Sequence, residues 1–155
     1  MHPIIRTKHQ ESDIEFPGDG IVTEFRVNIK LVIEVIDAGV TKIDSPASPF
    51  TVGNKDIKVS FKNFGLVTLD SLDIEWEINE IPQPTYKWLG NLAPGDSICN
   101  ILIGNNDFTY GVDTIKAWTA NPNGYLDIFN NNDTIENLVT ACYPMSGLYI
   151  RRRTV

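Results

Sequence analysis

The sequence predicts an all-β protein, an immunoglobulin-like antiparallel β-sandwich of about seven strands. Apolar and polar residues alternate along several strand-length stretches, which places one face of each stretch in a core and the other in water. Clusters of Gly, Pro, Asn and Asp separate these stretches, as turns do. Because no stretch has the period of a long helix, a fold that alternates strands with helices is not expected.

The expected strands follow in chain order from this alternation. The alternation is clear over residues 25–35, 57–61 and 72–78, and less regular strands are expected over residues 98–103, 114–119 and 134–140. Trp76 lies on the apolar phase of its stretch, as Phe61 does on its own, so both side chains are expected in the core.

A length of 155 residues fits one domain with flanking segments. Residues 1–20 are polar and rich in turn formers, which predicts a disordered or extended leader. Residues 21–36 predict an N-terminal strand, too long for an ordinary one, that either ends a preceding domain or forms an edge strand. The sandwich is expected over residues 37–140, and residues 141–155 are expected to form a C-terminal connector.

The formal net charge of -7 and the pI of about 4.7 argue against nucleic acid as a partner, since a phosphate backbone would be repelled. No apolar run is long enough to span a bilayer. The first residues lack a secretion signal, so the chain is either cytosolic or an internal piece of a longer exported protein. Cys99 and Cys142 are compatible with a disulfide or with two free thiols.

Catalysis by a nucleophile with a histidine base is not expected, because the only histidines, His2 and His9, fall in the predicted leader. Asp73, Glu75 and Glu77 share one face of an amphipathic strand, where a solvated surface is the ordinary explanation. The sequence therefore predicts no enzyme; a pocket with converging carboxylates of raised pKa would reopen that question.

Oxygen-rich side chains gather in the region before the last predicted strand. Calcium binds six to eight oxygen ligands, so these residues are candidate calcium ligands: Asn121, Asn123, Asp127, Asn131 and Asp133. Their spacing does not match an EF-hand loop, and Asn-rich tight turns explain most of them without a metal.

Two aromatic residues are candidates for sugar binding. Tyr86 and Trp88 lie in a segment rich in proline, where exposed rings would stack on carbohydrate. The alternative is that these rings fold back onto the sandwich.

A series of short motifs runs through the chain in a recognisable order. They are residues 37–40 (DAGV), 43–46 (IDSP), 59–65 (VSFKNFG), 74–79 (IEWEIN), 92–96 (LAPGD), 117–124 (AWTANPNG) and 131–134 (NNDT). Their order resembles the CARDB-like domains (cell-adhesion-related domains of bacteria), Ig-like modules repeated in large surface and secreted proteins of Bacteroidetes. The resemblance covers residues 37–150 and carries no catalytic residues.

The resemblance implies a non-catalytic spacer or adhesion module in a large bacterial cell-surface or secreted protein, with neighbouring domains of the same polypeptide as partners. The alternative is a carbohydrate- or calcium-dependent module whose partner is a polysaccharide or a surface protein. Asp followed by a hydroxyl residue and an apolar residue also resembles a Bacteroidetes O-glycosylation acceptor, at Ser71, Ser97, Thr114 and Thr134. Ordinary strand entrances explain the same pattern.

Overall fold

The computed structural model describes residues 34–127 and 132–144. The chain divides into two compact units, Met1–Val35 and Ile36–Val155, and every strand named below belongs to the second unit. Its elements are β1 (Ala38–Ser45), β2 (Phe50–Thr51), β3 (Gly53–Asn63), β4 (Leu69–Ile78), β5 (Ile81–Pro82), β6 (Tyr86–Leu92), β7 (Ser97–Phe108), β8 (Gly111–Ala120), the single 3-10 turn η1 (Pro122–Gly124) and β9 (Thr134–Cys142).

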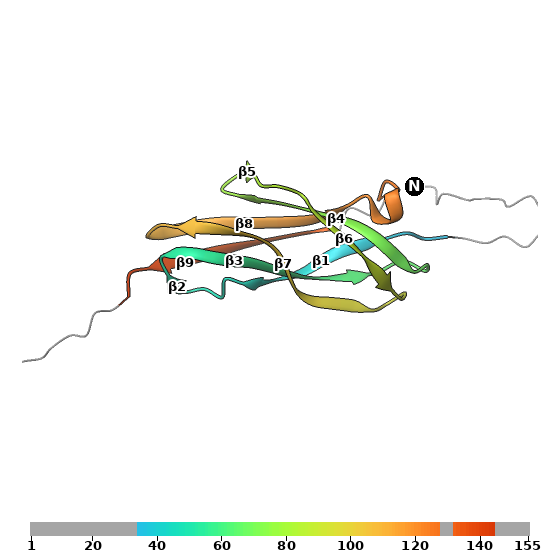
Figure 1. The fold of residues 1–155 in the computed structure, drawn as a ribbon, viewed down its shortest axis with the longest axis horizontal. Coiled ribbons are helices and arrows are strands. Elements are labelled where there is room, and N and C mark those ends of the chain that lie inside the picture. Colours follow the sequence, from blue (N-terminus) through green and yellow to red (C-terminus); the bar gives the residue numbers. More distant parts are fainter. Residues whose placement is uncertain (1–33, 128–131, 145–155) are drawn as a thin grey trace, which may run out of the picture. The chain divides into compact units, whose positions relative to one another are not determined.

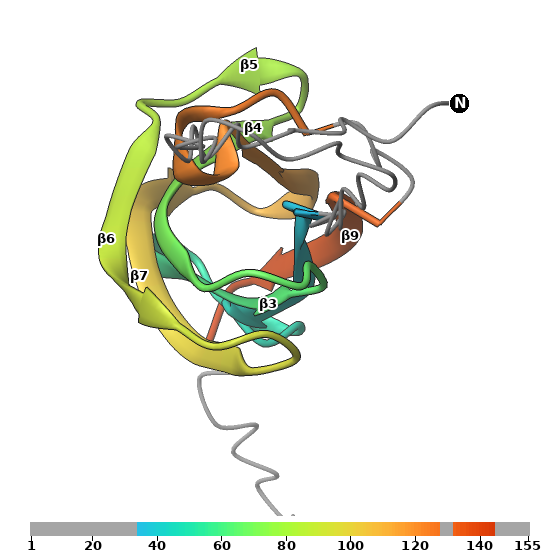
Figure 2. The same cartoon turned by 90° about the vertical axis from the view of Figure 1, so that its right-hand side faces the viewer.

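The strands form two sheets that face each other across the core (Figures 1 and 2). One sheet has the order β1-β3-β7, and the other has the order β2-β9-β8-β4-β5, with β6 also paired to β4. All pairings are antiparallel except that of the two-residue β2 with β9, which is parallel. Two of the nine strands in the described part of the chain have only two residues, which leaves seven longer ones. The predicted Ig-like β-sandwich of about seven strands is confirmed.

The core lies where the alternating apolar residues predicted it. Phe61 from β3 is fully buried, and Trp76 from β4 is 2% exposed. The indole Nε1 of Trp76 donates a hydrogen bond to the carbonyl of Pro84 at 3.0 Å, so the buried ring keeps a partner for its polar atom. The prediction that both rings lie in the core is confirmed.

The segment that contains Trp88 is a strand and not a loop. Trp88 pairs with Leu72 of β4, and its side chain is only 7% exposed. Its ring meets that of Phe61 edge to face, with the ring centroids 5.2 Å apart. The alternative that the Trp88 ring folds back onto the sandwich is therefore confirmed, and Trp88 is not an exposed sugar-binding ring, because the register of β6 turns this residue into the core. Tyr86 is partly buried and packs against the same core.

The structure adds a strand at the N-terminal end of the sandwich and extends the last strand at the other end. A strand over Ala38–Ser45 was not predicted, since its apolar residues do not alternate cleanly. At the other end, β9 continues through Ala141 and Cys142, which the sequence assigned to the connector, because Ala141 is fully buried and pairs with Gly111. The predicted leader, nearly all of the predicted N-terminal strand and most of the predicted connector lie outside the described residues.

Candidate metal centre

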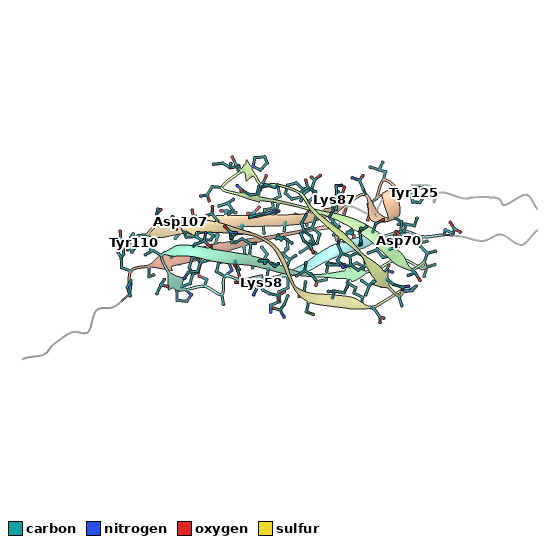
Figure 3. The ribbon with its side chains drawn as sticks, viewed as in Figure 1. Lys58, Asp70, Lys87, Asp107, Tyr110 and Tyr125 are labelled. Carbon is teal, nitrogen blue, oxygen red and sulfur yellow. The ribbon has the colours of Figure 1, made fainter. Side chains whose placement is uncertain are left out.

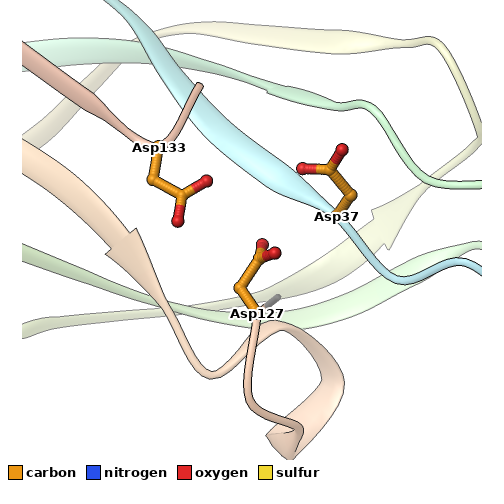
Figure 4. Close-up of side chains that lie close together, drawn as sticks. All are labelled: Asp37, Asp127 and Asp133. Atoms are coloured by element: carbon orange, nitrogen blue, oxygen red, sulfur yellow. The ribbon is translucent and has the colours of Figure 1, made fainter. Parts of the chain in front are cut away.

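Three aspartates converge at one end of the sandwich. Asp37 directly precedes β1, Asp133 directly precedes β9, and Asp127 lies between η1 and β9. One carboxylate oxygen from each lies within 4.8 Å of the other two. Figure 4 shows the three carboxyl groups pointing toward a common centre. The topology thus brings together three acids from widely separated positions in the chain.

Hydrogen bonds from neighbouring groups fix two of these carboxylates. The backbone N–H of Ala38 donates to Oδ2 of Asp127 at 3.2 Å. The side-chain amide of Asn132 donates to Oδ1 of Asp37 at 3.0 Å. Each of these bonds joins the start of β1 to the segment that precedes β9, so the acidic cluster lies where the two sheets meet.

The backbone beneath the cluster ties the sheets together. The carbonyl of Asp133 accepts hydrogen bonds from the N–H of Val40, at 3.3 Å, and from that of Thr119, at 3.2 Å. The hydroxyl of Thr119 in turn donates to the carbonyl of Ala38 at 2.7 Å. These bonds link β1 of one sheet to β8 of the other and hold Asp133 at the junction.

A glycine allows this close approach. A Cβ atom on Gly39 would lie 2.3 Å from the backbone oxygen of Asn132, far inside van der Waals contact. Only a residue without a side chain fits at position 39, because the backbone of Asn132 packs directly against it. The DAGV motif therefore has a specific structural role at this junction.

The acidic cluster is electrostatically unfavourable without a cation. Burial, together with the negative charges of Asp127 and Asp37, raises the pKa of Asp133 to about 7. Burial also raises the pKa of Asp37, with a contribution from Asp127 and against the lowering effect of the Asn132 hydrogen bond. Asp133 is 5% exposed, so water solvates its charge poorly.

A buried carboxylate oxygen without a hydrogen-bond partner among the described residues lies at the same place. Oδ1 of Asp133 is buried and has no hydrogen-bond partner among the described residues, and the same holds for Oδ1 of Asn132. Buried polar atoms are nearly always paired with protein, water or an ion. Three convergent carboxylates with an unsatisfied buried oxygen are a suitable set of donors for a hard divalent cation.

Only part of the predicted calcium set belongs to this cluster. Asp127 and Asp133 do. The Asn121 amide instead donates to Asp73 at 3.0 Å. Asn123 binds the start of β4: its Oδ1 accepts from the N–H of Asp70 at 2.8 Å. Asn131 lies outside the described residues.

Asp37 was missed as part of the site. Asp37 is about ninety residues from the other two acids, and sequence spacing gives no sign of that contact. Asp37 does fall in a landmark motif, DAGV, but that motif indicates only turns and core positions.

The cysteines and the hydroxyl residues of the acceptor-like motifs lie on strands. Cys99 is exposed and Cys142 is half-buried, and both are free thiols. Ser97 and Thr134 are exposed, while Ser71 and Thr114 are half-buried. Glycosylation of these four residues stays a prediction.

No protein-family model matches the chain, and no curated protein matches it. Among solved structures, it is similar to the crystal structure of the CARDB domain of the PF1109 protein in complex with di-metal ions from Pyrococcus furiosus. That match has a TM-score of 0.54 and 18% sequence identity, and covers 73% of this chain and 99% of the other. The fold is CARDB-like. A solution structure of the same Pyrococcus domain also matches the CARDB-like fold of this chain, with a TM-score of 0.51 at 20% identity, covering 70% of this chain and 97% of that one.

The similarity to these solved structures concerns the fold and not the biological setting. The resemblance to CARDB domains is confirmed at the level of architecture, and placement in a Bacteroidetes surface protein stays a prediction. Within residues 34–127 and 132–144, the structure contains no helix with the length and apolar character needed to cross a membrane.

Proposed function

We propose that this chain is a non-catalytic CARDB-like spacer or adhesion module of a longer extracellular or cell-surface polypeptide, and that a calcium ion held by Asp37, Asp127 and Asp133 locks one end of it. The observation that carries the proposal is the convergence of three carboxylates, one of which has a buried oxygen with no hydrogen-bond partner among the described residues. Neighbouring domains of the same polypeptide are the expected partners.

Calcium fits this set of donors better than other common ions. All three residues offer oxygen, the ligand preferred by calcium and magnesium, whereas zinc sites usually include histidine or cysteine. Ligand oxygens up to 4.8 Å apart match an ion that binds oxygen at roughly 2.3–2.6 Å on opposite sides. Magnesium binds oxygen at roughly 2.0–2.1 Å and requires near-ideal octahedral geometry, so oxygens up to 4.8 Å apart suit it less well.

The position of the cluster suits a load-bearing module. Asp37 precedes the first strand of the sandwich, so a pull from a preceding domain would reach the fold at this point. The cation would join β1 to the segment before β9, where Asn132 and the Asp133 carbonyl already bridge the sheets. An extracellular setting supplies calcium at millimolar concentration, and extracellular calcium modules bind with a Kd of about 10⁻⁴–10⁻³ M.

The acidic cluster has one property of an active site, since Asp133 has a raised pKa. A glycosidase, however, separates its two carboxyl groups by about 5–5.5 Å or about 6.5–9.5 Å so that a sugar fits between them. In this cluster one oxygen from each of three acids lies within 4.8 Å of the other two, which is closer than either of these separations. Shared coordination of an ion uses all three acids, whereas acid–base catalysis of this kind uses two.

Isothermal titration of the 155-residue chain with CaCl₂, and separately with MgCl₂, tests the proposal. We expect one calcium site with a Kd of about 10⁻⁴–10⁻³ M and weaker binding of magnesium. Asp133→Asn should lower the calcium affinity at least tenfold. Asp107→Asn is the matched control, because Asp107 is exposed and lies at the opposite end of the sandwich from Tyr125, which is next to η1 (Figure 3). The absence of calcium binding, or equal loss in both variants, would contradict the proposal.

A further inference from the structure

A pocket of about 290 Å³ opens beside the acidic cluster, at the end of β8 and the segment before β9. Its lining combines two kinds of surface. Trp118 and the 78% exposed Leu126 supply apolar area, while Asp127 and Asp133 supply carboxylates of the acidic cluster. Small-ligand sites commonly combine apolar walls with a few polar groups that fix orientation.

The Trp118 ring is held in place before any ligand arrives. Its indole Nε1 donates to a carboxylate oxygen of Glu75 at 3.0 Å. The ammonium group of Lys116 lies 5.5 Å from the ring centroid on the same strand. A ring held by two neighbours loses little conformational entropy when a ligand packs on it.

Charge selects the kind of ligand that would fit. Three ionised carboxylates and one calcium ion leave one net negative charge in the cluster, and the chain as a whole carries -7. A phosphate, sulfate or carboxylate ligand would therefore be repelled. Neutral hydroxyl oxygens can complete the six to eight ligands of calcium without that repulsion, because three side chains leave coordination positions to fill.

We propose that this pocket binds a neutral saccharide, with sugar hydroxyls coordinating the calcium ion and the apolar face of the sugar ring packing on Trp118 and Leu126. The proposal rests on the calcium site proposed above. It replaces Tyr86 and Trp88 as the sugar-binding surface, since Trp88 is in the core. Two exposed residues, Thr134 and Asn121, also line the pocket and would contact the sugar.

A printed glycan array, probed with the 155-residue chain in calcium and in EDTA, tests this inference. We expect binding to neutral glycans in calcium that EDTA abolishes. Trp118→Ala should weaken that binding at least tenfold and leave the calcium affinity measured by titration unchanged. Leu126→Ala, at a position too exposed to affect folding, should weaken it about threefold.

The matched aromatic control is Tyr110→Ala. Tyr110 is 66% exposed and stacks on Tyr143 with ring centroids 5.4 Å apart, at the end of the sandwich opposite Tyr125 (Figure 3). The Tyr110→Ala variant should bind glycans as the unmodified chain does. Loss of binding in this variant and not in Trp118→Ala would overturn the inference.

Three other outcomes would also overturn it: glycan binding that persists in EDTA, binding restricted to sulfated or sialylated glycans, and no glycan binding by a chain that still binds calcium. The last of these leaves the proposed calcium function intact. Failure to bind calcium in the titration removes the proposed function itself, so the two failures are distinguishable.

Discussion

Asp37 and Asp133 each stand immediately before a strand, β1 in one sheet and β9 in the other, and their carboxylate oxygens lie within 4.8 Å of each other. Like charges at this distance destabilise the metal-free fold, and a shared cation would turn the same geometry into a link between the sheets. The cluster is therefore expected to respond to protons, to metal and to substitution in ways that an ordinary acidic surface would not.

The stability of the metal-free protein should rise as the pH falls from 8 to about 5. The pKa of Asp133 in the folded protein is about 7, above its unfolded value of 3.8, so the folded state binds more protons in this range. The stability contributed by protonation is lost as the pH rises through 7. Urea unfolding in EDTA should give a gain of about 1–2 kcal/mol at pH 5 relative to pH 8, because one pKa unit corresponds to about 1.4 kcal/mol and partial solvation reduces the effect.

Below about pH 4 the trend should reverse. Hydrogen bonds from Ser60 and Lys42 outweigh burial and lower the pKa of Asp44, and the hydrogen bond from Lys87 lowers the pKa of Asp73. In this range the unfolded state binds more protons at these two acids than the folded state does, so stability falls.

The control for the rise between pH 8 and pH 5 is Asp133→Asn, in which that rise should be much smaller. A profile identical to that of the unmodified chain would show that Asp133 is not the titrating group.

Gly39→Ala should weaken calcium binding although residue 39 supplies no ligand. The added Cβ would lie 2.3 Å from the Asn132 oxygen and displace the segment that holds Asp133. We expect at least tenfold weaker calcium affinity by titration and a loss of about 1–3 kcal/mol in stability, typical of overpacking.

Gly104→Ala is the control for this substitution. Gly104 lies on β7, a strand that contributes no residue to the acidic cluster. The added Cβ would lie 2.4 Å from the ring of Trp76. It should lower stability and leave calcium affinity unchanged. Equal calcium affinity in the two variants would mean that packing at Gly39 does not position the site.

Trp88→Ala should destabilise the protein by about 3–5 kcal/mol, the usual cost of removing a large buried aromatic side chain. The reason is its contact with Phe61 in the core, where Trp88 is 7% exposed. Leu89→Ala, one residue later and 79% exposed, should change stability by no more than about 0.5 kcal/mol. Urea unfolding checks both values. A neutral Trp88→Ala would place this ring in solvent and restore it as a sugar-binding candidate.

Asn63→Ala should cost about 2–4 kcal/mol, because it leaves several buried polar groups without partners. The Asn63 side chain is 1% exposed. Its amide donates to the carbonyls of Val67 and Leu92, at 2.8 and 2.9 Å, and its oxygen accepts from the N–H of Gly65 at 2.9 Å. Denaturant unfolding measures the loss. A cost below about 0.5 kcal/mol would show that water replaces these bonds freely.

The sequence predicted the sandwich well because period-two alternation depends only on local residues, as in β4, where Trp76 and its apolar neighbours all face the core. It failed for Trp88, since the proline-rich segment before it suggested a loop, and only pairing with Leu72 reveals the strand. The site was half predicted for a similar reason. Asp127 and Asp133 are close in sequence, but Asp37 joins them only when the first and last strands meet.

The most direct test of the proposed calcium site is the free energy of unfolding in EDTA and in 10 mM calcium at pH 8, measured for the unmodified chain and for Asp133→Asn. With a Kd of about 10⁻⁴ M, calcium should stabilise the unmodified chain by about 2.7 kcal/mol. Asp133→Asn should be more stable than the unmodified chain in EDTA, because one repelling charge is gone. Its affinity for calcium is at least tenfold weaker, so it should gain at most about 1.4 kcal/mol from calcium. An equal gain in unfolding free energy from calcium in both proteins, or no gain in the unmodified chain, would contradict the proposed calcium site.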